Sequence, residues 1–184
     1  MPYNVPTVTT SDISFGPARL FLGAAGTTPT VDVGSITEDG VSIEITAEKR
    51  YIAQGNPRVN YYSFTQAQSA MVKITGIEWD FDNFLFALGA GTTTVSGSEA
   101  TFSFGGDPIV TQVALHVQHY MASSGNTMNV YVWKASSEGG LTLPLGQDEH
   151  SFEYNFTALA ADTAWDGVTA LDAKSKLLKI VREL

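Results

Sequence analysis

The longest regular pattern in the sequence is an alternation of apolar and polar residues that begins at Val41. Between positions 41 and 48 the odd positions are apolar and the even positions are polar. This period of two is typical of a β-strand with one face against a core. A Gly-Asn-Pro sequence at 55–57 favours a turn. The aromatic and β-branched run from Val59 to Ile77 predicts a partner strand.

Residues 41–78 are therefore predicted to form a β-hairpin with unusually long strands. Strands of 14 and 19 residues would reach roughly 45–65 Å, whereas a domain of this size has a radius of gyration of roughly 16 Å. We expect the hairpin to extend beyond its own domain, where a lone ribbon with open edges is marginally stable. Other copies of the chain would then cover it. The alternative is a pair of strands that bends over one core.

Shorter patterns predict the elements around this hairpin. Apolar residues at i, i+3, i+4 and i+7 after Asp80 predict a short helix that ends before Gly89. The buried face of this helix is predicted to contain Phe81, Phe84, Leu85 and Leu88. Further strands are predicted at 18–22, 101–104, 109–121, 127–135, 149–158 and 177–181, with a loop at 90–97. Trp165 is expected to anchor the small, polar segment 160–173.

These elements predict a mainly β protein, with a β-sandwich or partly closed barrel, one short flanking α-helix and a long protruding β-hairpin. The chain has 184 residues and contains neither an internal repeat nor a linker between domains. We therefore expect a single domain over 1–184 with an N-terminal arm at 1–14.

Composition and charge disfavour several functions. The net charge is −9, which argues against a passive nucleic-acid binder but not against a conduit that must avoid holding nucleic acid. The absence of cysteine excludes disulfides and thiolate metal sites. No stretch approaches 18 apolar residues and the N-terminus lacks the pattern of a signal peptide, so we expect no membrane partner and a cytoplasmic place of synthesis.

No motif predicts catalysis, a cofactor or a metal site. His116 and His119 would lie on opposite faces of a strand, so they would not share a metal ion. The sequence Gly89-Ala90-Gly91 begins like a dinucleotide-binding motif, but Thr94 replaces its third glycine and the motif follows a helix. We therefore expect a protein that is not an enzyme.

Positive charge gathers at the predicted hairpin tip. Residues 41–78 carry a net charge of +1, so the remaining chain carries −10. The tip residues are candidates for a contact between subunits in which they bind the acidic surface of a neighbour. These candidates are Lys49, Arg50, Tyr51 and Arg58. The alternative is a solvated turn with ordinary charges.

Six segments follow one another in a characteristic order. They are Phe15-Gly16-Pro17 with 20–23, Asp32-Val33-Gly34 with 39–41, the hairpin 41–78, the helix within 78–89, and the segments 102–106 and 152–156. In this order, which covers nearly the whole chain and is more specific than any single motif, the sequence resembles the major tail tube proteins of long-tailed bacteriophages.

This resemblance implies a structural virion protein related to the inner tubes of contractile tails and of type VI secretion. Members of the family form hexameric rings that stack into a hollow tube for DNA ejection. The implied location is the virion tail, after assembly in the host cytoplasm. The implied partners are further copies and other tail proteins, such as the tape measure, terminator and distal tail proteins. Double-stranded DNA would pass through without specific binding.

In this family the long hairpin contributes to the barrel that lines the channel, and the arm, C-terminal segment and loops join successive rings. The polar face of the hairpin would then meet the lumen, although a one-residue bulge would invert the assignment locally. The predicted lumen-facing residues are Ser42, Glu44, Thr46, Glu48, Ser69, Lys73 and Thr75. Alternatives are another virion part, namely a contractile-tail inner tube or capsid-decorating protein, or a β-sandwich binding module with exposed Trp79, Trp133 or Trp165.

Overall fold

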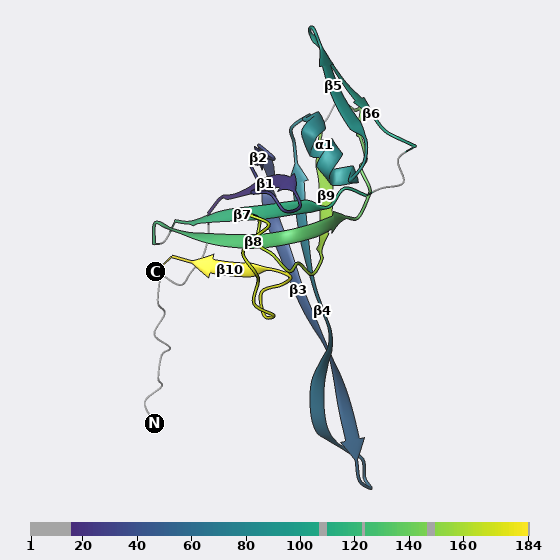
Figure 1. Ribbon diagram of the computed structural model, residues 1–184, viewed down its shortest axis with the longest axis vertical. Coiled ribbons are helices and arrows are strands. Elements are labelled where there is room, and N and C mark those ends of the chain that lie inside the picture. The colour runs from purple at the N-terminus through teal and green to yellow at the C-terminus, as the bar shows by residue number, and fades with distance from the viewer. Residues whose placement is uncertain (1–15, 107–109, 123, 147–149, 184) are drawn as a thin grey trace.

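The computed structural model describes residues 16–106, 110–122, 124–146 and 150–183, so the predicted arm at 1–14 lies outside the described residues. The predicted mainly β fold is confirmed (Figure 1). The elements are β1 (Ala18–Ala24), β2 (Val31–Asp32), β3 (Ile36–Gln54), β4 (Val59–Gly76), α1 (Phe81–Leu88), β5 (Thr92–Ser96), β6 (Glu99–Ser103), β7 (Val113–Met121), β8 (Asn126–Ser137), β9 (Phe152–Ala158) and β10 (Lys179–Arg182).

Within these described ranges, eight strands form one antiparallel sheet in the order β2-β1-β7-β8-β9-β4-β3, with β10 also paired to β8. Strand β8 is long enough to hold β9 along residues 135–137 and β10 along residues 128–131. In Figure 1, β7 and β8 run across β3 and β4, so the sheet bends over itself. Strands β2 and β3 lie at the two ends of this strand order and do not pair with each other in the described part of the chain, so the bent sheet corresponds to a partly closed barrel.

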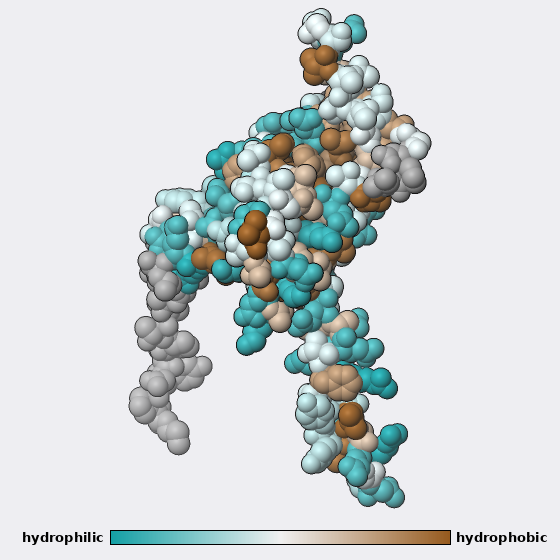
Figure 2. Space-filling view, viewed as in Figure 1, coloured by the Kyte–Doolittle hydropathy of each residue, from teal (hydrophilic) through white to brown (hydrophobic). Residues whose placement is uncertain are grey.

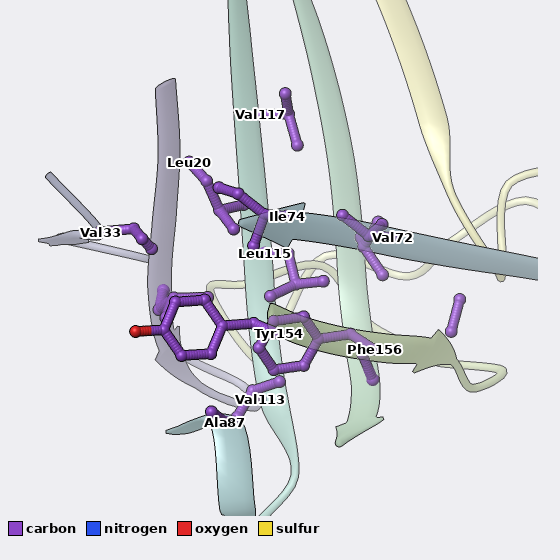
Figure 3. Close-up of a cluster of buried hydrophobic side chains, with 14 of the residues drawn as sticks. Leu20, Val33, Val72, Ile74, Ala87, Val113, Leu115, Val117, Tyr154 and Phe156 are labelled. Carbon is purple, nitrogen blue, oxygen red and sulfur yellow. The ribbon is translucent and has the colours of Figure 1, made fainter. Parts of the chain in front are cut away.

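The core lies between the two crossing parts of this sheet. Figure 3 shows β4, which carries Val72 and Ile74, crossing β7, which carries Leu115 and Val117, with these side chains between the two strands. Alternation explains the inward side chains, because every second residue of a strand points to the same face. The inward faces of β7, β8 and β9 all contribute to this core. They contain Val113, Leu115, Val117, Val130, Val132, Phe152, Tyr154 and Phe156, all buried.

Helix α1 has the predicted bounds and caps. The Asp80 carboxylate accepts a hydrogen bond from the backbone N–H of Asp82 at 2.9 Å, which makes Asp80 the N-cap. Gly89 ends the helix in the left-handed conformation, with a φ of 63°. The helix therefore starts and stops where local sequence signals place it.

The buried face of α1 differs in part from the prediction. Phe84 is buried as predicted, but Phe81, Leu85 and Leu88 are only half-buried. Asn83 and Ala87 are buried with Phe84 instead. The Asn83 side-chain amide donates to the backbone carbonyl of Val33 at 3.0 Å, which explains how a polar residue faces inward.

A second hairpin occupies the predicted loop at 90–97, so that prediction was wrong. Strand β5 pairs with β6 through five residue pairs, from Thr92–Ser103 to Ser96–Glu99. The two residues between the strands form a tight turn, and Gly97 has the positive φ of 61° that such turns favour. In Figure 1 this hairpin lies at the end of the molecule opposite the tip of β3 and β4.

The connection between β2 and β3 is attached to the start of α1 by one carboxylate. The Glu78 side chain accepts a hydrogen bond from the backbone N–H of Ser35 at 2.7 Å. Hydrogen bonding from Ser35 holds the pKa of Glu78 below its ordinary value of 4.5. This contact joins the two ends of the hairpin base, because Ser35 precedes β3 and Glu78 follows β4.

We expect acidification to weaken this attachment. The folded-state pKa of Glu78 is depressed, so its stabilisation is present above the ordinary pKa and is lost as the pH falls through the folded value. Glu78→Gln should therefore show a smaller loss of thermal stability than the wild type between neutral pH and about pH 3. Glu99→Gln, at an exposed position of β6, is the control. Equal slopes for the wild type and Glu78→Gln would contradict this role.

Candidate functional site

The long hairpin leaves the body of the protein for much of its length. Every residue of β4 from Val59 to Ser69 is exposed, and Ala70 is the first buried one. Figure 1 shows β3 and β4 continuing together far from the other strands, ending in the turn between Gln54 and Val59. The hairpin does not bend over the core, which was the alternative considered from the sequence.

The exposed part of the hairpin has free edges on both sides within the described residues. Strand β3 is the last strand of the sheet, so its outer edge pairs with no other strand in the part of the chain that the structure describes. Strand β4 pairs with β9 from Met71 to Gly76, and no described strand pairs with residues 59–70 on that side. Open edges of this length present backbone N–H and C=O groups that can pair with another chain.

The pairing register places the predicted lumen-facing residues on one face. Ser42 lies opposite Lys73 and Thr46 lies opposite Ser69. Directly opposite residues in an antiparallel pair share a face, and alternation adds Glu44, Glu48 and Thr75 to it. The other face carries Ile43 opposite the buried Val72 and Val41 opposite the buried Ile74. The seven predicted residues are therefore directed away from the core, and each is exposed or half-buried.

Charges on this polar face are exposed. The Lys73 Nζ lies 3.6 Å from a Glu44 carboxylate oxygen, with both side chains well exposed. Such surface pairs contribute little to stability because water and salt screen them. The pair offsets one negative charge of this face, whereas Glu48 lies directly opposite the uncharged Ala67.

Strand β9 extends the polar face in a way that sequence reasoning missed. Glu153, Asn155 and Thr157 lie opposite Thr75, Lys73 and Met71 of β4. The Thr157 hydroxyl also donates to the Glu138 carboxylate, which brings another acidic group beside this face. Alternation in β9 separates these residues from the buried aromatic ones, but only the pairing of β9 with β4 shows which surface they join.

Two of the three register shifts between β3 and β4 lie in the outer part of the hairpin. Glu48 pairs with Ala67 and Lys49 pairs with Thr65, so Gln66 is an extra residue in β4. A second extra residue, Tyr61, lies nearer the turn. Such bulges change which residues of the two strands share a face and increase the local twist. From Ser42 to Glu48 the even residues of β3 lie opposite odd residues of β4, whereas Arg50 and Ile52 lie opposite even residues.

The four candidate tip residues do not form one surface. Lys49 and Tyr51 lie on one face of β3 and Arg50 lies on the other, because adjacent strand residues alternate. Arg58 belongs to the turn. All four are exposed. Their positive charges therefore surround the end of the hairpin.

The tryptophans give little support to a carbohydrate-binding platform. Trp133 is buried and its indole N–H donates to the backbone carbonyl of Ser175 at 2.8 Å. The Trp165 N–H donates to the Val132 carbonyl at 3.2 Å, which confirms that Trp165 anchors its segment. Trp79 remains 47% exposed, and its ring packs edge-on against Phe152.

The histidines are not arranged as metal ligands. The His116 ring stacks on Tyr131 and its Nε2 lies 3.0 Å from the Asn129 side-chain oxygen. Burial lowers the pKa of His116. No group of three or more histidine, aspartate or glutamate side chains suited to a metal ion occurs in the part of the chain that the structure describes.

The sequence matches no protein-family model, and no curated protein matches it. Across the described ranges, no helix has the length and apolar character needed to cross a membrane.

Proposed function

We propose that this chain is a structural subunit that assembles into hexameric rings, and that these rings stack into the hollow tail tube of a bacteriophage. The tube serves as the conduit for DNA ejection. The observation that carries the proposal is the long hairpin, whose β4 strand is exposed from Val59 to Ser69 and whose edges pair with no other described strand there. A ring of copies would cover such a hairpin through a heterologous contact that closes by rotation, and stacked rings would give a filament.

The polar face supports a role as a channel wall. It carries Glu44, Glu48 and Glu153 against Lys73, so its net charge is negative. A negative wall discourages the phosphate backbone from adhering, which suits a conduit through which DNA must pass. The free edges of β3 and β4 would pair with neighbouring copies and continue the sheet around the channel.

The remaining parts of the proposal follow from this role. The protein would act in the virion tail after assembly in the host cytoplasm, without catalysis or a cofactor. Besides its own copies, its partners would be the tail proteins at the ends and in the lumen of the tube, namely terminator, distal tail and tape measure proteins. DNA would pass without specific binding.

We expect the purified protein to self-associate as its concentration rises. Light scattering should report a mass that increases with concentration, and negative-stain images should show six-fold rings or smooth filaments. Dilution should reverse the association, because the contacts form between surfaces that are already exposed in the folded monomer. A compact monomer at every concentration would contradict the proposal, and trimers would favour a capsid-decorating protein instead.

A further inference from the structure

The outer half of the long hairpin groups three large apolar side chains on one face, whereas the exposed Tyr51 lies opposite Ser63 on the other face. Ile52, Tyr62 and Phe64 are 51%, 61% and 40% exposed. Ile52 lies directly opposite Tyr62, and Phe64 lies opposite Arg50 on the same face. We refer to Ile52, Tyr62 and Phe64 as the distal apolar face. Figure 2 shows apolar residues exposed among hydrophilic ones along this part of the protein.

The bulge at Gln66 produces this grouping. On the body side of the bulge, even residues of β3 pair with odd residues of β4, as in the Glu48–Ala67 pair. Continued without a bulge, that register would place Tyr62 and Phe64 on the face opposite Ile52. The extra residue changes the register so that even residues pair with even residues. Three apolar side chains that would otherwise lie on two faces therefore share one.

The same bulge ends the polar face described above. Two-stranded ribbons twist more strongly than larger sheets, and a bulge increases that twist. Figure 1 shows the two strands crossing over each other between the body and the tip. The distal apolar face therefore need not look in the direction of Glu44 and Glu48, even though alternation along β3 connects them. A channel-facing polar wall and an apolar contact surface are compatible on one hairpin.

Charge identifies the partner of this face. Residues 49–68 contain Lys49, Arg50 and Arg58 and no aspartate or glutamate, a net charge of +3. Since the whole chain carries −9, everything outside this segment carries −12. The outer hairpin and the rest of another copy are thus electrostatically complementary. A second copy therefore offers an acidic protein surface on which apolar side chains with a basic rim can pack.

We propose that the distal apolar face packs on a second copy of this chain, with the tip cations at the rim of that contact. This inference rests on the self-assembly proposed above and adds which face of the hairpin makes the contact. Aromatic side chains at the centre and charges at the edge are the usual arrangement of a protein–protein interface. Removal of Tyr62 should therefore weaken assembly without affecting the folded monomer.

The test compares Tyr62→Ser, Tyr62→Phe and the exchange variant Y62S/S63Y. Because Ser63 lies next to Tyr62 on the opposite face, the exchange keeps the composition and moves only the aromatic ring. Light scattering would give the concentration at which half of each protein is assembled. We expect this concentration to rise about thirtyfold for Tyr62→Ser and for the exchange, since truncating an aromatic anchor commonly weakens an interface by that factor. Tyr62→Phe should assemble like the wild type.

Circular dichroism and the thermal midpoint of the dilute proteins check the fold, and both should be unchanged because this region lies outside the core. Assembly of Tyr62→Ser at the wild-type concentration would overturn the inference and leave the proposed function standing. Assembly of the exchange variant would overturn the assignment of the face. A wild type that never self-associates would overturn the proposed function together with the inference.

Discussion

Replacement of Phe84 by alanine is expected to lower the free energy of unfolding by about 3–5 kcal/mol, the range for deleting a fully buried phenylalanine. The Phe84 side chain is 1% exposed. Its ring centroid lies 5.1 Å from that of Phe152 and 6.2 Å from that of Phe102, both in edge-on contacts. The substitution would leave a cavity between α1 and the sheet that the surrounding rings cannot fill without moving.

Urea unfolding of dilute protein, where assembly does not add to stability, is the appropriate measurement. Phe104→Ala is the matched control because Phe104 is 65% exposed, and it should change the free energy by no more than about 0.5 kcal/mol. Equal midpoints for the two variants would mean that α1 does not pack on the core. A changed denaturant slope would indicate an altered denatured state rather than a simple loss of packing.

The hairpin and the helix were predictable because their signals are local. Alternation that begins at Val41, an aromatic and β-branched run after Val59 and a turn between them are sufficient to define two strands. Asp80 and Gly89 give the ends of α1 through contacts within a few residues. Where the partner is distant, prediction was less successful. Asn83 is buried because its amide reaches Val33, which lies 50 positions away.

The sequence did not reveal which strands are neighbours in the sheet, so part of the candidate site could not be predicted. Strand β4 pairs with β9 across a long separation in the sequence, so the contribution of Glu153 and Asn155 to the polar face could not be inferred from their own segment. The extra residue Gln66 has no sequence signature either, since it follows the strand pattern of its neighbours. The β5–β6 hairpin was missed because its glycine- and threonine-rich sequence is equally typical of a loop.

Replacing both Glu44 and Glu48 by lysine is expected to make the assembled protein retain double-stranded DNA. The two glutamates share the polar face with Lys73, and Lys73 lies 3.6 Å from Glu44. The double substitution would turn a predominantly negative surface into one with three lysines in each subunit. Repeated around a ring, these lysines would release counterions from DNA on contact, and binding would weaken steeply as salt rises.

Retention of labelled DNA by assembled protein at low and moderate salt would measure this effect. Both glutamates are exposed and lack core contacts, so rings should still form, and light scattering would verify this. Single substitutions provide a charge-matched comparison, because Glu48→Lys and Glu99→Lys change the net charge equally, and Glu99 lies on the β5–β6 hairpin away from the polar face. DNA retention by Glu48→Lys but not by Glu99→Lys would locate the channel wall at the polar face. If the double-lysine variant assembles normally but retains no DNA at low salt, Glu44 and Glu48 do not line the channel.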